Sequence, residues 1–331
     1  MAEIIPLGPD LVRTSVGKTE MTDSLNLPSL ADFFERRTER SGNPPILLTI
    51  AGSDPSAGAG IQADLKTFSA LGVYGLTVIT AITGQNSRGV MSIHPLPSKV
   101  VRDQLQSVLD DFDVTAIKIG MIASRETRVM LEHELRDVTC PIILDPISQS
   151  TSGMSFTGEE RLIPFLGSLI NRAYLITPNI PEVEELTGIQ VDSTEAMQLA
   201  GEMLLMMGAQ NVLIKGGHDR HSDLSDSTDV LVTPEETFLF RSPRIESTNL
   251  HGTGCTLSSA IASFIAHGEG LPYAVRLAKE YVSHAIESAQ YQTIGNGYGP
   301  LDHFFNTKNP AWSDVAHRSW REEPLRATQQ V

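Results

Sequence analysis

Short apolar runs alternate with segments of helical periodicity along most of the chain. Runs rich in β-branched residues, for example ILLTIA at 46–51, LTVITA at 76–81 and NVLIK at 211–215, are typical of strands. Between such runs, apolar positions recur with the spacing of a helix face, as they do at 99–112 and 272–290. Strands that alternate with helices favour right-handed crossovers and a mostly parallel sheet covered on both faces. The sequence therefore predicts an α/β fold.

One stretch breaks this alternation. Two short strand patterns, at 228–233 and 237–243, lie on either side of a Pro-Glu-Glu turn. Two strand patterns separated by such a short turn are typical of an antiparallel hairpin. We expect this hairpin to form an edge of the sheet.

Both ends of the chain are polar. Residues 1–44 finish in the turn-rich sequence ERSGNPP, although SLADFFERR at 29–37 fits a short amphipathic helix. We interpret 1–44 as a partly disordered extension that lies outside the sheet and is dispensable for catalysis. Residues 306–331 are polar and interrupted by proline, which predicts a loosely ordered tail. A single domain over 45–305 is therefore expected.

Composition and charge narrow the class of protein. The 331 residues are 40% hydrophobic, and no apolar run approaches the roughly 20 residues that span a bilayer. A formal net charge of −15 provides no basic face for a nucleic-acid backbone. Two cysteines are too few for a disulfide framework, and the first 44 residues lack the apolar region of a signal peptide. We therefore expect a cytoplasmic protein without nucleic-acid or membrane partners.

The first glycine-rich segment, GSDPSAGAG at 52–60, follows a predicted strand and precedes a predicted helix. Gly58 to Ala63 matches the G-x-G-x-x-A pattern of dinucleotide-binding loops. That pattern also needs an acidic residue about 20 positions later, and none occurs between Lys66 and Asp103. A Walker A sequence is absent as well. The segment is thus either a cradle for another ligand or a tight connection without a ligand.

The second glycine-rich segment contains Gly252, Thr253 and Gly254 and leads into a helical pattern of small residues. Backbone N–H groups at the start of a helix have no partner within the helix and can bind an anion. Cys255 falls in the first turn, where the helix dipole is expected to lower the pKa of a thiol. The alternative is a buried small residue that packs against the sheet.

Further polar residues follow other predicted strands. Lys215 ends one strand and is followed by two glycines, of which Gly217 would let the backbone approach a ligand. Ligands of open parallel sheets bind at the carboxyl ends of the strands, although a lysine there often only reaches solvent. Asp145, Asn179 and Glu182 also follow strands. Asn179 either caps a helix and Glu182 faces solvent, or these residues hold a hydrated Mg²⁺ that bridges to nucleotide phosphates.

Several motifs together resemble one known family. AGSDPSAGAGIQADLKTFSALGVYG, ITAITGQNSRGV, KIGM, ILDP, ITPNIPE, IKGGH and NLHGTGCTLSSAIA occur in the order and rough spacing of the hydroxymethylpyrimidine/phosphomethylpyrimidine kinases. The resemblance extends from about residue 45 to 305. It implies a ribokinase-like three-layer αβα fold, with ATP and Mg²⁺ as phosphoryl donor. The implied reactions phosphorylate 4-amino-5-hydroxymethyl-2-methylpyrimidine and then its monophosphate, in thiamin biosynthesis.

The resemblance also implies roles for individual residues. The residues carried over to the pyrimidine pocket are Gly52, Ala59, Asp64, Gln85 and Met121. The carboxamide of Gln85 offers one donor and one acceptor, which complement the ring nitrogen and amine of an aminopyrimidine. The residues expected to hold phosphate charge are Lys215, Gly217, Gly252, Thr253 and Gly254. Cys255 would accept the hydroxymethyl proton, and Mg²⁺ would lie near Asp145, Glu182 and Asn179.

Two features of the sequence qualify the resemblance. Sugar and pyridoxal kinases of the superfamily usually have aspartate where this chain has Cys255, which favours the pyrimidine over a vitamin B6 alcohol. Many relatives have a lysine before a Ser-Gly pair, where this chain has STSG at 150–153. The alternatives are a pyridoxal kinase and a catalytically silent binding protein. We also expect a homodimer, and a monovalent cation in the site is left open.

Overall fold

A mixed sheet of ten strands runs through the protein. The structure is a computed structural model that describes residues 18–20, 28–38, 42–149, 162–217 and 226–307. Its strands are β1 (Lys18–Glu20), β2 (Ile46–Ser53), β3 (Tyr74–Asn86), β4 (Gly89–Pro95), β5 (Ala116–Ile119), β6 (Ile142–Leu144), β7 (Leu175–Ile176), β8 (Val212–Ile214), β9 (Asp226–Val232) and β10 (Thr237–Pro243). Their order across the sheet is β1-β10-β9-β8-β7-β6-β5-β2-β3-β4. The expectations for 150–153 and for the tail beyond 307 lie outside the described residues.

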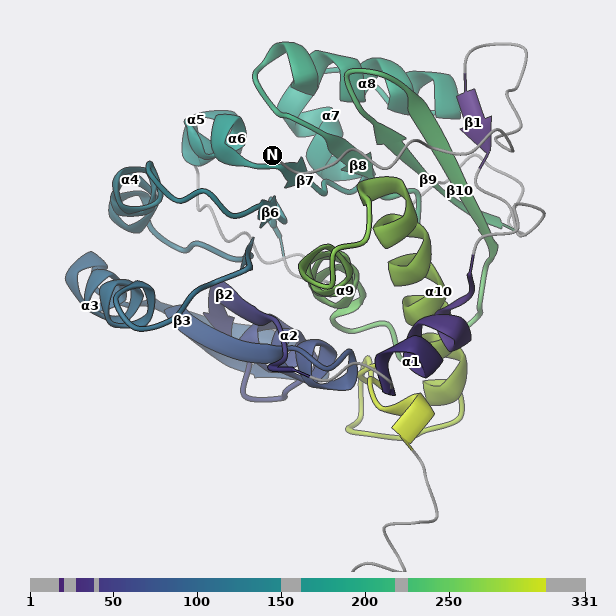
Figure 1. Ribbon diagram of the computed structural model, residues 1–331, viewed down its shortest axis with the longest axis horizontal. Coiled ribbons are helices and arrows are strands. Elements are labelled where there is room, and N and C mark those ends of the chain that lie inside the picture. The colour runs from purple at the N-terminus through teal and green to yellow at the C-terminus, as the bar shows by residue number, and fades with distance from the viewer. Residues whose placement is uncertain (1–17, 21–27, 39–41, 150–161, 218–225, 308–331) are drawn as a thin grey trace, which may run out of the picture.

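Helices cover both faces of this sheet (Figure 1). They are α1 (Leu30–Thr38), α2 (Gly60–Ala70), α3 (Ser98–Leu109), α4 (Arg125–Glu134), α5 (Leu162–Leu166), α6 (Leu169–Arg172), α7 (Ile180–Thr187), α8 (Thr194–Met206), α9 (Thr253–Ala266), α10 (Leu271–Ala289) and the 3-10 turn η1 (Phe305–Thr307). The predicted helices at 99–112 and 272–290 are thus confirmed as α3 and α10. None of the helices in the described ranges is long and apolar enough to cross a membrane.

Alternation along the strands produces two hydrophobic cores. In β2, Leu48 and Ile50 pack in the core beneath α3 to α8, whereas Leu47 packs in the opposite core with α1, α2, α9 and α10. Successive strand residues point to opposite faces, so a strand that is apolar throughout can fill both cores. The β2 residues Leu47, Leu48 and Ile50 are fully buried. The expected three-layer αβα architecture is therefore confirmed.

The centre of the sheet is parallel and its borders are not. Parallel pairs join β3, β2, β5, β6, β7 and β8. The predicted hairpin is confirmed as β9–β10, which pairs antiparallel with itself and with β8. A second antiparallel hairpin, β3–β4, forms the opposite edge and was not predicted from the sequence. Only Ser87 and Arg88 connect these strands, and neither is a glycine or proline of the kind that marks a turn in a sequence.

The N-terminal segment is part of this architecture, contrary to expectation. β1 pairs in parallel with β10 and forms the outer edge of the sheet, so residues 18–20 do not lie outside it. α1 confirms the amphipathic helix, and its Leu30 and Phe33 are buried in the core beside α9 and α10. The Phe33 ring lies 4.9 Å from that of Phe264, in an edge-on arrangement. Residues 1–44 are polar on average, so their composition gave no indication that a few apolar side chains would be buried in the core.

Candidate active site

The two glycine-rich segments touch each other at the carboxyl ends of the strands. We call residues 52–60 the first loop, and residues 249–254 the second loop. Gly252 has a φ of 86°, a conformation that favours glycine, and a Cβ atom there would overlap the carbonyl oxygen of Gly58. A Cβ on Gly58 would in turn overlap the ring of His251. Glycine is needed at both positions because two backbones approach closely.

The first loop is held by the carboxylate of its own Asp54. Asp54 accepts hydrogen bonds from the backbone N–H groups of Ser56 at 2.8 Å, Gly58 at 3.1 Å and Ala59 at 2.8 Å. His251 Nε2 lies 2.9 Å from the same carboxylate. Burial alone would raise the pKa of Asp54, but these hydrogen bonds lower it to about 2. The amides of this loop are therefore already paired with a negative charge.

The second loop leads into α9 without a cap. Gly252 is the residue before the helix and, as a glycine, has no side chain to accept a hydrogen bond from the first turn. The Thr253 N–H donates to the Leu250 carbonyl at 3.2 Å, so the amides that remain for an anion are those of Gly254 and Cys255. Partial positive charge at this helix end favours an anion. The predicted anion hole thus has suitable geometry.

Lys215 lies beside this helix end. Its Nζ is 2.8 Å from Asp145 Oδ1, and a Cβ on Gly254 would come within 3.4 Å of the same nitrogen. Asp145 also accepts a hydrogen bond from Thr177 Oγ1 at 3.0 Å. Burial disfavours the charged lysine, but Asp145 and Glu182 outweigh this effect and raise the pKa of Lys215. A permanent cation is therefore available next to the anion hole.

Asn179 and Glu182 form the capping box of α7. Glu182 N–H donates to Asn179 Oδ1 at 2.9 Å, and Asn179 N–H donates to Glu182 Oε2 at 2.8 Å. The capping explanation for Asn179 is thus confirmed, whereas the alternative in which Glu182 faces solvent is wrong, because its side chain is buried. Burial and the neighbouring Asp145 raise the pKa of Glu182 to about 7, against the opposing charge of Lys215.

The donor set around Asp145 and Glu182 fits Mg²⁺. Within the described ranges, no group of three or more His, Cys, Asp or Glu side chains could hold a metal by itself. Mg²⁺ in nucleotide sites normally keeps several waters and takes one or two carboxylates together with substrate phosphates. Two buried carboxylates near an uncapped helix end match that requirement. The metal role of these residues remains a prediction.

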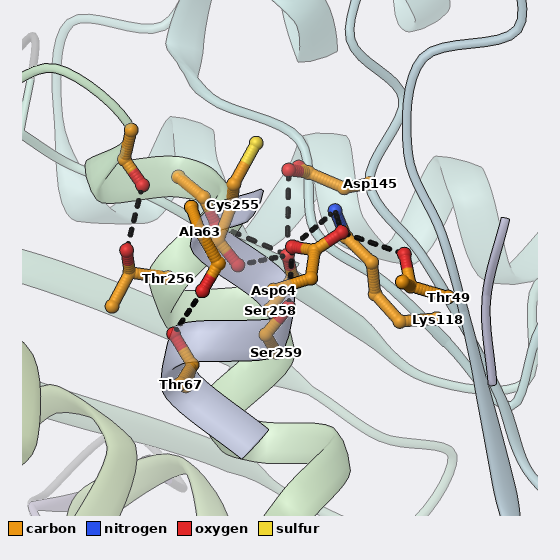
Figure 2. A network of polar contacts seen from close by, with 12 residues as sticks. Thr49, Ala63, Asp64, Thr67, Lys118, Asp145, Cys255, Thr256, Ser258 and Ser259 are labelled. Carbon is orange, nitrogen blue, oxygen red and sulfur yellow. Dashed lines mark hydrogen bonds and ion pairs between the residues drawn. The ribbon is translucent and has the colours of Figure 1, made fainter. Parts of the chain in front are cut away.

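A buried ion pair under the second loop was not predicted. Lys118 Nζ lies 2.9 Å and 3.0 Å from the two oxygens of Asp64, and both side chains are fully buried. Asp64 also accepts hydrogen bonds from Thr49 Oγ1 and Ser259 Oγ, each at 2.6 Å. Figure 2 shows this network between α2, β5 and α9. A lysine inside the apolar strand sequence AIKIG is the signal that could have revealed it.

Cys255 lies in the first turn of α9, as expected, but its thiol is not acidified. Burial raises its pKa to about 11, and the positive charge of Lys118 and a hydrogen bond from the Gly60 N–H offset this only in part. The expected lowering of the pKa is wrong because loss of hydration outweighs the helix dipole at a buried site. The resting residue is a neutral thiol.

The remaining predicted pocket residues surround the first loop. A Cβ on Gly52 would overlap the terminal methyl of Met121, so these two residues are in contact. Gln85, at the end of β3, lies with its Nε2 3.1 Å from His251 Nε2. Ala59 precedes α2, and its N–H is held by Asp54. These residues are thus gathered at one place, whereas Asp64 is turned into the buried ion pair. His251 was not singled out from the sequence.

Comparison with known proteins agrees with this geometry. A sequence model of the phosphomethylpyrimidine kinase family matches residues 54–302. The hydroxymethylpyrimidine/phosphomethylpyrimidine kinase of Streptomyces coelicolor is 43% identical over 260 residues, which are 78% of this chain and 94% of that protein.

Solved structures of related kinases have the same fold. A phosphomethylpyrimidine kinase structure from Clostridium difficile is 41% identical, with a TM-score of 0.63, and the match covers 73% of this chain and 99% of that one. The pyridoxal kinase of Staphylococcus aureus in complex with ADP is 30% identical, with a TM-score of 0.73, over 81% and 96% of the two chains. This chain belongs to the phosphomethylpyrimidine kinase family.

Proposed function

We propose that the protein transfers a phosphoryl group from ATP to 4-amino-5-hydroxymethyl-2-methylpyrimidine, and then a second one to the resulting monophosphate. The observation that carries this proposal is the uncapped start of α9, with Lys215 beside it and Cys255 in its first turn. Gln85 and Met121 lie around the adjoining first loop. The residues proposed for the acceptor and for the phosphates thus adjoin each other, which supports phosphoryl transfer between them.

The chain contributes mainly charge and position to this reaction. Lys215 and the amides of Gly254 and Cys255 stabilise negative charge on the group in transfer, because they are fixed before the reaction begins. Asp145 holds Lys215 at 2.8 Å and, with Glu182, would hold Mg²⁺. Bound Mg²⁺ supplies neutralisation of the donor phosphates. Gly217 lies two residues after Lys215, and a Cβ there would meet no atom of the described residues within 4 Å, which supports a close approach of a nucleotide phosphate.

Cys255 accepts the proton of the hydroxymethyl group in the first reaction. The alcohol oxygen forms a bond to the terminal phosphorus of ATP, the bond from that phosphorus to ADP breaks, and the alcohol proton passes to Cys255 Sγ. A neutral thiol must first lose its own proton to solvent, and Lys118 together with the Gly60 N–H favours the resulting thiolate. In the second reaction the acceptor is an ionised phosphate, which needs little or no base.

The direct test is a coupled assay of ADP release with three acceptors. We expect turnover with the pyrimidine alcohol and with its monophosphate, and a kcat/KM for pyridoxal that is lower by about tenfold or more. Pyridoxal is included because the pyridoxal kinase of S. aureus has a similar structure. A higher kcat/KM for pyridoxal than for the pyrimidine would show that pyridoxal is the substrate. Absence of ATP turnover with every acceptor would favour a silent binding protein.

We also propose that the enzyme is a cytoplasmic homodimer. Ile82 of β3 and Met91 of β4 are half exposed or more, at 50% and 67%, on the hairpin that ends the sheet. An edge strand with exposed apolar side chains is a natural surface for a second copy. Sedimentation equilibrium of the wild type and of Met91→Asp would test this, since a monomeric wild type contradicts the dimer.

A further inference from the structure

His251 connects three segments that are far apart in the sequence. It lies in the second loop, Asp54 lies in the first loop, and Gln85 is the last residue but one of β3. One ring nitrogen of His251, Nε2, is 2.9 Å from Asp54 Oδ2 and 3.1 Å from Gln85 Nε2. Both His251 and Asp54 are buried, at 9% and 3% exposure. A single nitrogen therefore faces two neighbours inside the pocket.

These two neighbours make opposite demands on His251. Asp54 is ionised, because its pKa is lowered to about 2, and a carboxylate can only accept hydrogen bonds. Nε2 must then carry a hydrogen and donate it to Asp54. A nitrogen that carries a hydrogen has no lone pair left for the amide N–H of Gln85. With its Nε2 towards His251, Gln85 would place two donors against each other at 3.1 Å.

Rotation of the Gln85 carboxamide by 180° removes this conflict. The two arms of a carboxamide have the same shape, so their partners determine which arm points where. The arm away from His251 lies 3.2 Å from Thr83 Oγ1, and Thr83 Oγ1 lies 3.0 Å from the Ser53 carbonyl. With its oxygen towards His251, Gln85 accepts the shared N–H and donates to Thr83, which in turn donates to Ser53. Each donor then has an acceptor.

We propose that Asp54, acting through His251, fixes the orientation of the Gln85 carboxamide and thereby determines which acceptor the enzyme recognises. This inference rests on the proposed function. In the fixed orientation, Gln85 presents one remaining acceptor and one remaining donor in a defined order. An aminopyrimidine carries an amine donor next to a ring-nitrogen acceptor and matches only one such order. The reversed amide places donor against donor and acceptor against acceptor, so binding is lost.

The test separates orientation from packing, since His251 also fills space beside Gly58. His251→Leu removes the donor, whereas the carboxamide of His251→Gln can still donate to Asp54. Each change is made in the wild type and together with Gln85→Leu. The matched control is His133→Leu, because His133 is exposed on α4 and distant in sequence from both loops. Thermal unfolding and circular dichroism confirm that each variant is folded.

We expect His251→Leu to raise the KM for the pyrimidine by about 10- to 100-fold, the usual cost of an unsatisfied buried group. The KM for ATP and the kcat should change by less than about threefold, and His251→Gln should recover most of the affinity. Gln85→Leu alone should also raise the pyrimidine KM, and adding His251→Leu to it should have little further effect. For 5-hydroxymethyl-2-methylpyrimidine, which lacks the amine, the wild type and His251→Leu should differ much less.

Three results would overturn the inference. Independent effects of His251→Leu and Gln85→Leu, an equal rise in the KM for ATP, or no recovery in His251→Gln would each show that His251 acts only in packing. If His251→Leu does not fold, His251→Phe, which keeps a ring but has no donor, takes its place with and without Gln85→Leu and gives the same decision. A wild type that fails to phosphorylate the pyrimidine overturns the proposed function and this inference together. An active wild type with independent variant effects overturns the inference alone.

Discussion

The two glycine-rich loops look alike in the sequence but use their backbone amides in opposite ways. Each follows a strand or an extended segment and leads into a helix, α2 after the first loop and α9 after the second. In the first loop, Asp54 accepts from the amides of Ser56, Gly58 and Ala59. In the second loop, no described side chain caps α9. The first loop is thus closed by its own anion, and the second can receive one.

This difference explains why glycines alone do not identify a ligand. Glycine allows a close approach of the backbone, but the charge that fills the amides decides what can bind. A carboxylate at Asp54 repels a phosphate from the first loop, so in the proposed reaction that loop would contact the uncharged pyrimidine ring of the acceptor. In the proposed reaction the phosphates would bind at the second loop, where Lys215 adds a positive charge. The informative residue of the first loop is therefore its aspartate.

The largest effect is expected at the second loop, in Cys255→Ala. This change should reduce phosphorylation of the alcohol by about 10²- to 10⁴-fold, the usual contribution of a general base. The monophosphate reaction should be affected much less, because that acceptor is already ionised. Cys255→Asp should restore part of the first activity. The measurement is kcat for each acceptor at saturating ATP, and an equal loss in both reactions would indicate a role in the geometry of the anion hole.

Substitution of one glycine in each loop by alanine should show whether the two loops have different functions. Gly252→Ala must adopt a positive φ and meets backbone at Gly58, so the second loop should be displaced. We expect a loss of about 10²- to 10³-fold in kcat, similar to the removal of an oxyanion-hole donor. Gly58→Ala meets only the His251 side chain and should mainly raise the pyrimidine KM. Equal losses of kcat in the two variants would contradict the assignment of phosphate binding to the second loop and acceptor binding to the first.

The state of the Cys255 thiol gives a pH-dependent test. Its pKa is raised to about 11, so the reactive thiolate is the minor form at neutral pH and increases about tenfold per pH unit. In a Cys140→Ser variant, Cys255 is the one remaining cysteine, and its alkylation by iodoacetamide should still accelerate at pH 9.5. A plateau between pH 7 and pH 8 would show instead that the helix dipole outweighs burial.

The smallest catalytic effect is expected from deletion of residues 1–44. Phe33 packs against Phe264 in the C-terminal half of α9, away from both loops, so kcat/KM should stay within a few-fold. Stability should fall, because Leu30 and Phe33 leave the core. In the full chain, Phe33→Ala should cost about 3 kcal/mol of unfolding free energy, and the half-buried Phe34→Ala less. A deletion that abolishes activity in a folded protein would show that this segment reaches the site.

Much of the fold was accessible from the sequence because its signals are local. Even the short central strands β6 and β7 lie within strand-like sequences of four or five residues, PIILD and YLIT, and the hairpin β9–β10 has its own turn. β1 is only three residues long, and β4 follows a turn without glycine-proline punctuation, so neither stands out. β1 and β4 form only by pairing with β10 and β3, at the two edges of the sheet.

The site divides in the same way. Residue types at strand ends singled out Lys215 and Asp145, which the structure brings together beside Gly254, because the carboxyl ends of parallel strands converge by topology. The remaining features of the site depend on which side chains contact each other in the folded protein. The sequence places Lys118 in an apolar strand, but only the tertiary structure shows that its partner is Asp64. Burial likewise raises the pKa of the Cys255 thiol, which its place in the helix alone had led us to expect to be lowered.

The sequence by itself determined which groups this protein has at the ends of its strands, and hence its family and the class of chemistry. Such information is carried by short segments and their order, which folding does not alter. Only the tertiary structure decided the protonation of those groups and the direction of their hydrogen bonds. His251 has two neighbours, Asp54 and Gln85, that are 197 and 166 residues away in the chain. Electrostatic and hydrogen-bonding energies depend on distances of a few ångströms and on access of water, and both are set by packing.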